Sequence, residues 1–214
     1  MQMTNNNLKS RTPFIEGDRI RLCLFDPKRD FHLLSSWHNK EEIRRYFSTY
    51  PCSNFTVRKG LESSEEDYKE FMFGIEMIDS NRLIGLVGLE SIDYINRNAE
   101  LYLLIGERSL WNRGYGTEAE KLMLHYGFME LNLNRIYTLD MEENLAARKS
   151  DEKAGLKYEF TMRDAILKFG RYHNVFVYSI LKKEYLSVFF NKNKPISTDL
   201  FSQNSWAPLE QGHA

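Results

Sequence analysis

The chain has 214 residues, 42% of them hydrophobic and 14% aromatic, which is typical of a globular domain and argues against wholesale disorder. With 29 basic and 30 acidic side chains the net charge is −1, so bulk attraction to nucleic acid or to an anionic membrane has no support. Cys23 and Cys52 form no C-x-x-C pair, which argues against a disulfide scaffold or a cysteine-rich zinc site. No run approaches the ~18 apolar residues that cross a bilayer, and the polar Met1–Arg11 lacks the apolar core of a signal peptide. We therefore expect a protein of the reducing cytoplasm.

The first third of the chain predicts one strand followed by helix. Arg19–Leu24 alternates apolar and polar residues, as a strand does, and the turn-forming Asp26-Pro27 follows it. Apolar residues at helical spacing then predict a helix over Phe31–Phe47, broken near Asn39. Ser63–Asp67 reads as the acidic start of a further helix.

The middle of the chain changes to β-rich runs at Phe71–Ile78, Leu83–Ile92 and Ala99–Ile105. Short polar connections separate these runs, and such connections favour an antiparallel meander. The period then lengthens, and apolar residues on one face predict a helix over Thr117–Leu131.

The last third predicts a strand–helix–strand crossover and a final strand. The elements are a strand over Arg135–Asp140, a short helix capped by Asn144 and ending near Gly155, and strands over Leu156–Phe160 and Val175–Leu181. The whole chain is therefore predicted to be α+β. We expect a polar extension over residues 1–16, one domain over 17–184, and a loosely held extension over 185–214.

The most informative segment is the glycine turn Trp111–Ala119, which lies between a strand and an amphipathic helix. Gly114 and Gly116 permit close approach of the backbone, and free N–H groups at a helix start can hold a phosphate or pyrophosphate. A plain strand-to-helix loop would also use these glycines. Gly114-x-Gly116-x-x-Ala119 satisfies the dinucleotide pattern too, with Asp140 ending the next strand. In the dinucleotide-binding fold, however, the first glycine follows its strand almost at once, and Gly114 does not.

Metal chemistry has little support in the sequence. The five histidines do not form a ligand cluster, and neither an H-E-x-x-H motif nor a G-x-S-x-G elbow is present. We therefore expect no metal.

Four segments, taken in order, resemble the GNAT superfamily of N-acetyltransferases, and most closely its branch of Rim-type and spermidine acetyltransferases. They are Arg19–Leu22, which resembles the opening strand, Arg82–Leu89, which resembles the central hairpin strand, Trp111–Ala119, which matches the coenzyme A loop, and Asn144–Leu156, which matches the N-x-x-A/S…E-K-x-G-F segment. The resemblance covers about Arg19 to Leu181. It implies a mixed central sheet of about seven strands with flanking helices, and acetyl-coenzyme A as co-substrate.

The resemblance also implies roles for particular residues. Backbone amides of the loop would hold the coenzyme A pyrophosphate, the preceding strand would pair with the pantetheine arm, and the helix-capping asparagine would hydrogen-bond that arm further along. The coenzyme-binding residues implied are Leu103, Leu104, Ile105, Arg108, Trp111, Arg113, Gly114, Tyr115, Gly116, Thr117 and Asn144. Asn144 would serve equally as a helix N-cap, and Arg108 equally as an ordinary surface arginine.

Two positions depart from the family pattern. Trp111 stands where glutamine or arginine is commoner, a minor change because the phosphate contacts expected there come mostly from backbone. Asp151 stands where many relatives have the tyrosine that protonates the leaving thiolate, and an ionised carboxylate would be a poor acid there. Tyr158, Tyr172 and water remain open alternatives for the acid.

Acetyl transfer to an amine needs a base that removes the amine proton before attack. Glu100 is our choice, since it precedes the strand residues expected to flank the thioester, and burial would raise its pKa towards neutrality. An ion pair with Arg97 is the alternative reading of Glu100. Glu90 and Asp93 are alternative bases, and both would also attract a cationic substrate.

The sequence therefore predicts an N-acetyltransferase that moves acetyl from acetyl-coenzyme A to a primary amine. A polyamine, a protein N-terminus, an aminoglycoside or an amino sugar all remain open as the acceptor. The alternatives are a non-catalytic acyl-coenzyme A sensor and, further off, a dinucleotide-dependent oxidoreductase. The resemblance also suggests a homodimer, formed through the last strands and the tail.

Overall fold

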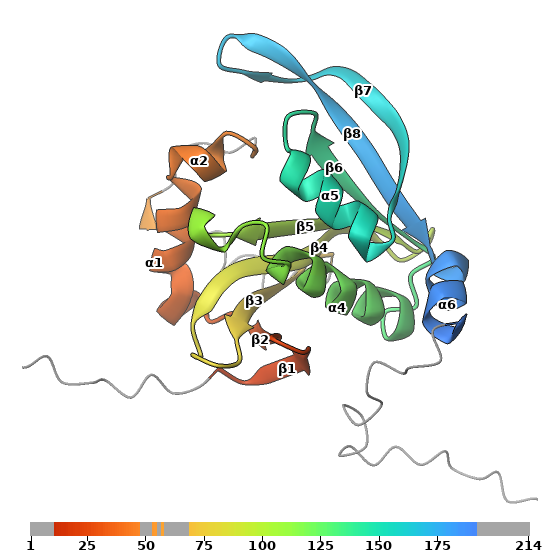
Figure 1. Ribbon diagram of the computed structural model, residues 1–214, viewed down its shortest axis with the longest axis horizontal. Coiled ribbons are helices and arrows are strands. Elements are labelled where there is room, and N and C mark those ends of the chain that lie inside the picture. Colours follow the sequence, from red (N-terminus) through yellow and green to blue (C-terminus); the bar gives the residue numbers. More distant parts are fainter. Residues whose placement is uncertain (1–10, 48–52, 55–56, 58–68, 192–214) are drawn as a thin grey trace, which may run out of the picture.

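The computed structural model describes residues 11–47, 53–54, 57 and 69–191 (Figure 1). Its strands are β1 (Pro13–Glu16), β2 (Ile20–Leu24), β3 (Phe71–Met77), β4 (Leu83–Asp93), β5 (Asn98–Ile105), β6 (Arg135–Met141), β7 (Lys157–Lys168) and β8 (Arg171–Leu181). Its helices are α1 (Pro27–His38), α2 (Glu41–Arg44), the 3-10 turn η1 (Arg108–Leu110), α4 (Tyr115–Met129), α5 (Leu145–Ala154) and α6 (Lys182–Asn191).

The strands form one eight-stranded sheet in the order β1-β2-β3-β4-β5-β6-β8-β7. Each neighbouring pair is antiparallel except β5 and β6, which are parallel. The antiparallel meander from β3 to β5 is not the βαβ unit that a dinucleotide fingerprint requires. The prediction of an α+β fold with a mixed sheet is confirmed, with β1 as the eighth strand.

Alternating residues of the central strands pack into two separate hydrophobic cores. On one face of β4, Leu89 belongs to a core that includes Met123 and Leu124 of α4. On the other face, Leu86 belongs to a smaller core with Leu34 and Trp37 of α1. The sheet therefore separates the α4 side of the molecule from the α1–α2 side, as Figure 1 shows.

Most predicted elements are found near their predicted bounds. The break expected near Asn39 is present, because Asn39 is the C-cap of α1 and α2 begins at Glu41. The last two strands extend further than predicted, through Lys168 and Arg171, where they meet in a tight hairpin turn. Most of the β7 side chains are exposed, so this strand lacks the apolar alternation that marks a half-buried one.

Some predictions concern the ends of the chain and the segment before β3. β1 and α6 lie in segments that the sequence analysis assigned wholly or mostly to the extensions, and the domain bounds remain a prediction. The helix start predicted at Ser63–Asp67 lies outside the described residues. Within the described part of the chain, helices long and apolar enough to span a membrane are absent.

Candidate active site

The parallel strands β5 and β6 separate after three paired positions. Their register runs from Asn98 opposite Arg135 to Glu100 opposite Tyr137. Beyond Glu100, β5 continues to Ile105 while β6 pairs with β8 as far as Met141. The outer half of β5 therefore turns one backbone edge towards the opening between the two strands, where an extended ligand could pair with it.

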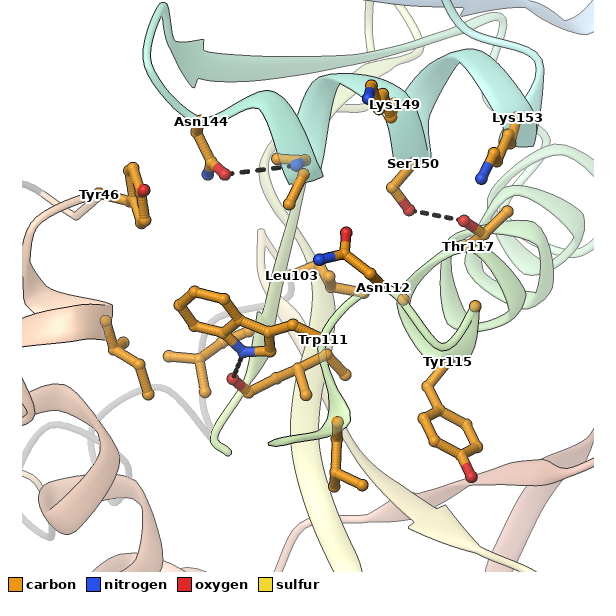
Figure 2. A pocket seen from close by; sticks show the side chains of 18 of the residues that line it. Tyr46, Leu103, Trp111, Asn112, Tyr115, Thr117, Asn144, Lys149, Ser150 and Lys153 are labelled. Atoms are coloured by element: carbon orange, nitrogen blue, oxygen red, sulfur yellow. Dashed lines mark hydrogen bonds between the residues drawn. The ribbon is translucent and has the colours of Figure 1, made fainter. Parts of the chain in front are cut away.

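A cavity of about 170 Å³ lies at this opening (Figure 2). Its walls are the end of β5, the start of α4, one face of α5 and the α2 region. The residues from α2 and its C-terminal turn are Ile43, Tyr46 and Phe47, and those from α5 and its N-cap are Asn144, Ala146, Ala147, Lys149, Ser150 and Lys153. Four segments far apart in sequence therefore meet around one hollow.

The glycine turn lines the cavity at the start of α4. Gly114 is the N-cap of this helix and has a φ of 85°, in the left-handed region that favours glycine. It provides no side-chain cap, so the first N–H groups of α4 remain available to an anion. At Gly116 a Cβ would lie 3.2 Å from Leu103 Cδ2 and 3.5 Å from Ser150 Oγ, filling space that the glycine leaves open. The backbone thus fits a phosphate-bearing ligand.

The structure brings most of the predicted coenzyme residues together around the cavity. Those that line it are Leu103, Leu104, Ile105, Trp111, Gly114, Tyr115, Gly116, Thr117 and Asn144. Arg108 and Arg113 are exposed and lie outside the lining. The Arg113 carbonyl instead accepts a hydrogen bond from Arg19 Nη1 at 2.9 Å.

Trp111 fixes the glycine turn against the strand that precedes it. Its indole Nε1 donates to the Ile105 carbonyl at 2.9 Å, and its ring lies in the cavity (Figure 2). The ring also lies 6.5 Å from that of Tyr46 on the opposite wall. A tryptophan at this place in the loop therefore has a structural role that glutamine or arginine would not fill in the same way.

Asn144 is both an N-cap and a cavity residue. Its Oδ1 accepts from the Ala147 N–H at 3.3 Å, which caps α5. Its side chain also lies at the cavity edge, facing Tyr46 across the hollow (Figure 2). The two roles considered for this residue are compatible in one conformation.

The sequence analysis missed three polar α5 side chains that line the cavity. Lys149 and Lys153 are one helical turn apart, and they offer positive charge at the cavity that the glycine turn also lines. Ser150 lies between them, 2.9 Å from Thr117 Oγ1, and donates to Glu120 Oε2 at 2.9 Å. The lysine spacing on the helix that Asn144 caps was the available signal, but their position opposite the turn was not readable from sequence.

Glu100 occupies the last paired position of β5, where the two parallel strands begin to separate. Burial, reinforced by the charge of Glu90 directly opposite on β4, raises its pKa to about 7. Burial and the charge of Glu70 raise the pKa of Glu90 as well. Among the described residues, no ion pair joins Glu100 to Arg97.

Tyrosines border these carboxylates. The Tyr102 hydroxyl donates to Glu70 Oε1 at 3.1 Å. Tyr137 lies opposite Glu100 on β6, and burial followed by the charge of Glu100 raises its pKa. Asp93 has a different position, because its carboxylate accepts from the backbone N–H groups of Ile95 and Asn96 at 2.9 and 2.8 Å in the turn before β5.

Asp151 lies in the interior rather than in the cavity lining. It is 2% exposed, and Thr138 Oγ1 donates to its Oδ2 at 2.8 Å. Burial raises its pKa and outweighs the opposing hydrogen bonds from Asp140 and Thr138. Tyr158 and Tyr172, the tyrosines considered for the acid, are 52% and 60% exposed and lie outside the lining. The proton donor for the leaving thiolate therefore remains unassigned.

Known proteins share this architecture. The acetyltransferase (GNAT) domain family matches residues 19–157 of the chain. The chain is similar to the uncharacterized N-acetyltransferase p20 of Bacillus licheniformis, at 28% identity over 160 residues that cover 73% of this chain and 89% of that protein. It is similar to the spermidine N(1)-acetyltransferase of Escherichia coli K12, at 27% identity over 161 residues that cover 75% of this chain and 85% of the relative.

A solved structure shares this fold. The spermidine N-acetyltransferase of Vibrio cholerae, in complex with CoA and spermine, superposes with a TM-score of 0.73 at 28% identity. The match covers 78% of this chain and 98% of that one. The chain therefore belongs to the GNAT family and is an acetyl-coenzyme A-dependent N-acetyltransferase.

Proposed function

We propose that this enzyme acetylates a primary amine that carries further positive charge, with a polyamine as the best candidate, and that Glu100 is the base. The observation that carries the proposal is the cross-strand pair of Glu90 and Glu100, placed where β5 and β6 separate. Two partly buried carboxylates in direct opposition repel each other unless a cation or a proton lies between them. Spermidine N-acetyltransferases among the relatives are consistent with such an acceptor.

The coenzyme half of the reaction relies on the cavity. When bound, acetyl-coenzyme A supplies the acetyl group as a thioester. The free N–H groups at the start of α4 would hold its phosphates, and the unpaired edge of β5 with Asn144 would hold its pantetheine arm. Lys149 and Lys153 would add positive charge beside the phosphates.

The acceptor half relies on the carboxylates. Glu100 takes the proton of the incoming ammonium, directly or through one water, so that the amine nitrogen has a lone pair for attack. A pKa of about 7 suits this task, because the carboxylate is then basic enough to accept a proton, and a substantial fraction of it is still ionised near neutral pH. Glu90 and Glu70 would hold the remaining positive charge of the acceptor.

The direct test is steady-state kinetics of Glu100→Gln over a panel of spermidine, an aminoglycoside, an amino sugar and a peptide N-terminus. We expect spermidine to be the best acceptor, and the substitution to lower kcat by about 10²–10⁴-fold, the usual contribution of a positioned base. Coenzyme binding should be unchanged. Asp93→Asn is the matched control, since it removes a carboxylate that is engaged in a turn, and it should leave kcat within about twofold.

The outcomes separate the parts of this proposal. If Glu100→Gln kept full kcat, Glu100 would not be the base. If only an amine without further positive charge, such as an amino sugar, were acetylated, the polyamine assignment would be wrong. The proposed coenzyme site would not be affected by that result.

A further inference from the structure

The end of the β7–β8 hairpin, residues Lys168–Asn174, contacts both sides of the coenzyme cavity. β6 pairs with β8 only as far as Met141 opposite Val175, so this hairpin end extends past the sheet, as Figure 1 shows. Phe169 and Gly170 form its turn with positive φ values of 50° and 75°. Two residues with positive φ form the tight turn that best matches the twist of a hairpin, so its tip has a defined direction.

One contact of the hairpin end reaches the α2 wall. The Lys168 ammonium donates to the backbone carbonyls of Arg44 and Phe47, at the end of α2 and just beyond it. Carbonyls at a helix C-terminus lack partners within the helix, so a lysine there satisfies them. Phe47 itself lines the cavity with its neighbour Tyr46.

The other contact reaches the turn before α5. His173 on β8 is 4% exposed, and its Nδ1 lies 2.6 Å from Glu143 Oε1. Asn174 holds the same turn, because its Nδ2 donates to Glu142 Oε2 at 2.9 Å and its carbonyl accepts from the Glu142 N–H at 3.0 Å. Asn144, which lines the cavity, directly follows Glu143 in this turn.

His173 joins the two contacts. Its Nε2 lies 3.1 Å from the carbonyl of Lys168, the residue that reaches α2. A carbonyl only accepts, and so does an ionised carboxylate, so both ring nitrogens must carry protons for both hydrogen bonds to form. Burial alone would raise the pKa of Glu143, but the hydrogen bond from His173 lowers it.

The charged groups around the ring come from three elements. Glu143 faces it from the turn before α5, and Arg171 on β8 donates to the same carboxylate oxygen at 3.1 Å. Lys168 on β7 offers the ring its carbonyl and turns its ammonium towards the Arg44 carbonyl. The ring is thus the shared link between Glu143, on the α5 side, and Lys168, on the α2 side.

We propose that His173 is a positioning residue for coenzyme binding, which holds the hairpin end so that Lys168 fixes the α2 wall and Glu143 fixes the Asn144 turn. The proposal rests on the coenzyme site described above, but it assigns His173 no contact with the ligand. The ring contacts, with Glu143 on one side and the Lys168 carbonyl on the other, are what connect the two walls.

The test is calorimetric binding of CoA by the full chain and by His173→Gln and Glu143→Gln. A glutamine amide presents its NH2 group to one neighbour and an accepting oxygen to the other, whereas the His173 ring lies between two acceptors. We therefore expect Kd to rise about 3- to 10-fold, the effect of losing one or two hydrogen bonds. The kcat at saturating coenzyme and amine should change less than about twofold, because no reacting group is altered.

His32→Gln is the matched control, because His32 is an exposed histidine on α1, away from the cavity, and its Kd should stay within about twofold. Lys168→Gln tests the α2 contact. Combined with His173→Gln it should raise Kd by less than the product of the two single effects, because both act through one structural link.

The results discriminate clearly. If both Glu143→Gln and His173→Gln bound CoA like the unsubstituted protein, the positioning role would be overturned. If His173→Gln failed to fold, Glu143→Gln decides alone, since that side chain is 37% exposed. A protein that binds no CoA before any substitution would overturn the coenzyme site itself, which is a different failure.

Discussion

The molecule buries two groups of carboxylic acids and neutralises them in opposite ways. Asp30 and Glu76, 1% and 0% exposed, lie between β3 and α1, and Arg11 reaches both at 2.6 and 2.7 Å. Glu120, Asp140 and Asp151 lie between α4, β6 and α5 at 2%, 9% and 2% exposure. Within the described residues, this second group makes no salt bridge and is hydrogen-bonded mainly by hydroxyl groups.

The titration behaviour follows from these partners. Burial alone would raise the pKa of Asp30, but hydrogen bonds from Arg29 and Arg11 outweigh it and lower that pKa. In the second group burial raises the pKa of Asp140, and its hydrogen bond to Asp151 raises it further. Asp140 Oδ2 is buried without a partner, which suits a protonated acid better than a charged one.

The comparison shows that burial alone does not determine the charge of a carboxylate in this protein. Guanidinium groups hold the pKa of Asp30 below its usual value, whereas burial without a salt bridge raises the pKa of each carboxyl in the second group. Glu100 follows the second pattern, since burial and a like charge act on it without an opposing cation. A raised pKa lowers stability in the interior at high pH, but at the strand opening it suits the base that we propose.

The largest change in stability should come from removing the arginine that pairs with Asp30 and Glu76. Arg11→Met leaves Asp30 and Glu76 buried with fewer cations, and we expect it to lower the free energy of unfolding by about 3–5 kcal/mol. Urea denaturation at neutral pH measures this. Arg82→Met is the control, because Arg82 is 50% exposed in its pair with Glu107 and should contribute less than about 1 kcal/mol. Equal effects of the two substitutions would remove the distinction between buried and exposed pairs.

A smaller change, this time an increase in the free energy of unfolding, should come from a substitution in the group of Glu120, Asp140 and Asp151. The folded-state pKa of Asp140 is raised, so its contribution to stability is fully present below the unfolded pKa of about 4 and is lost as the pH rises through the folded pKa. Asp140→Asn removes this loss, and we expect it to raise the free energy of unfolding at pH 8 by about 1 kcal/mol or more. Stability measured from pH 5 to pH 8 should fall less steeply in the variant. A profile parallel to that of the unsubstituted protein would mean that Asp140 does not retain its proton.

The smallest effect concerns the site. Glu90→Gln removes the like charge opposite Glu100, so the pKa of Glu100 should fall, by less than about one unit because burial is the larger cause. Activity declines at low pH when the base is protonated, and a lower pKa moves that decline to lower pH. The pH profile of kcat measures the shift, with Glu107→Gln as a surface control. A decline that moved to higher pH would contradict the assignment of the base.

Local patterns explain what the sequence could predict. The glycine turn and Asn144 were recognised because each is defined by neighbours along the chain, and both line the cavity. The sequence predicts only the inner parts of the last two strands, Leu156–Phe160 and Val175–Leu181, because the outer part of β7 is exposed and carries no apolar alternation. The contacts of Lys168 with Arg44 and Phe47 join residues more than a hundred positions apart, which no local pattern encodes.

The charge states of buried carboxyl groups are the second feature that the sequence could not predict. The family resemblance puts Asp151 where many relatives have a tyrosine, and the fold buries its carboxyl group with Asp140 and Thr138. Asp140 was read only as the acidic residue of a dinucleotide motif. In both cases the side chain's partners, rather than its identity, determine its chemistry, and those partners come from different elements of the fold.

The uncapped start of α4 has an evolutionary consequence. Since Gly114 leaves the first N–H groups of the helix open, the proposed phosphate contacts are made by main chain and are the same whatever side chains surround them. The side chains of Arg108 and Arg113 lie outside the cavity lining, so the proposed main-chain contacts do not depend on them. A lineage can therefore drift far in sequence while it keeps its coenzyme. Relatives sharing little more than a quarter of their residues, like those found here, are what such a main-chain site permits.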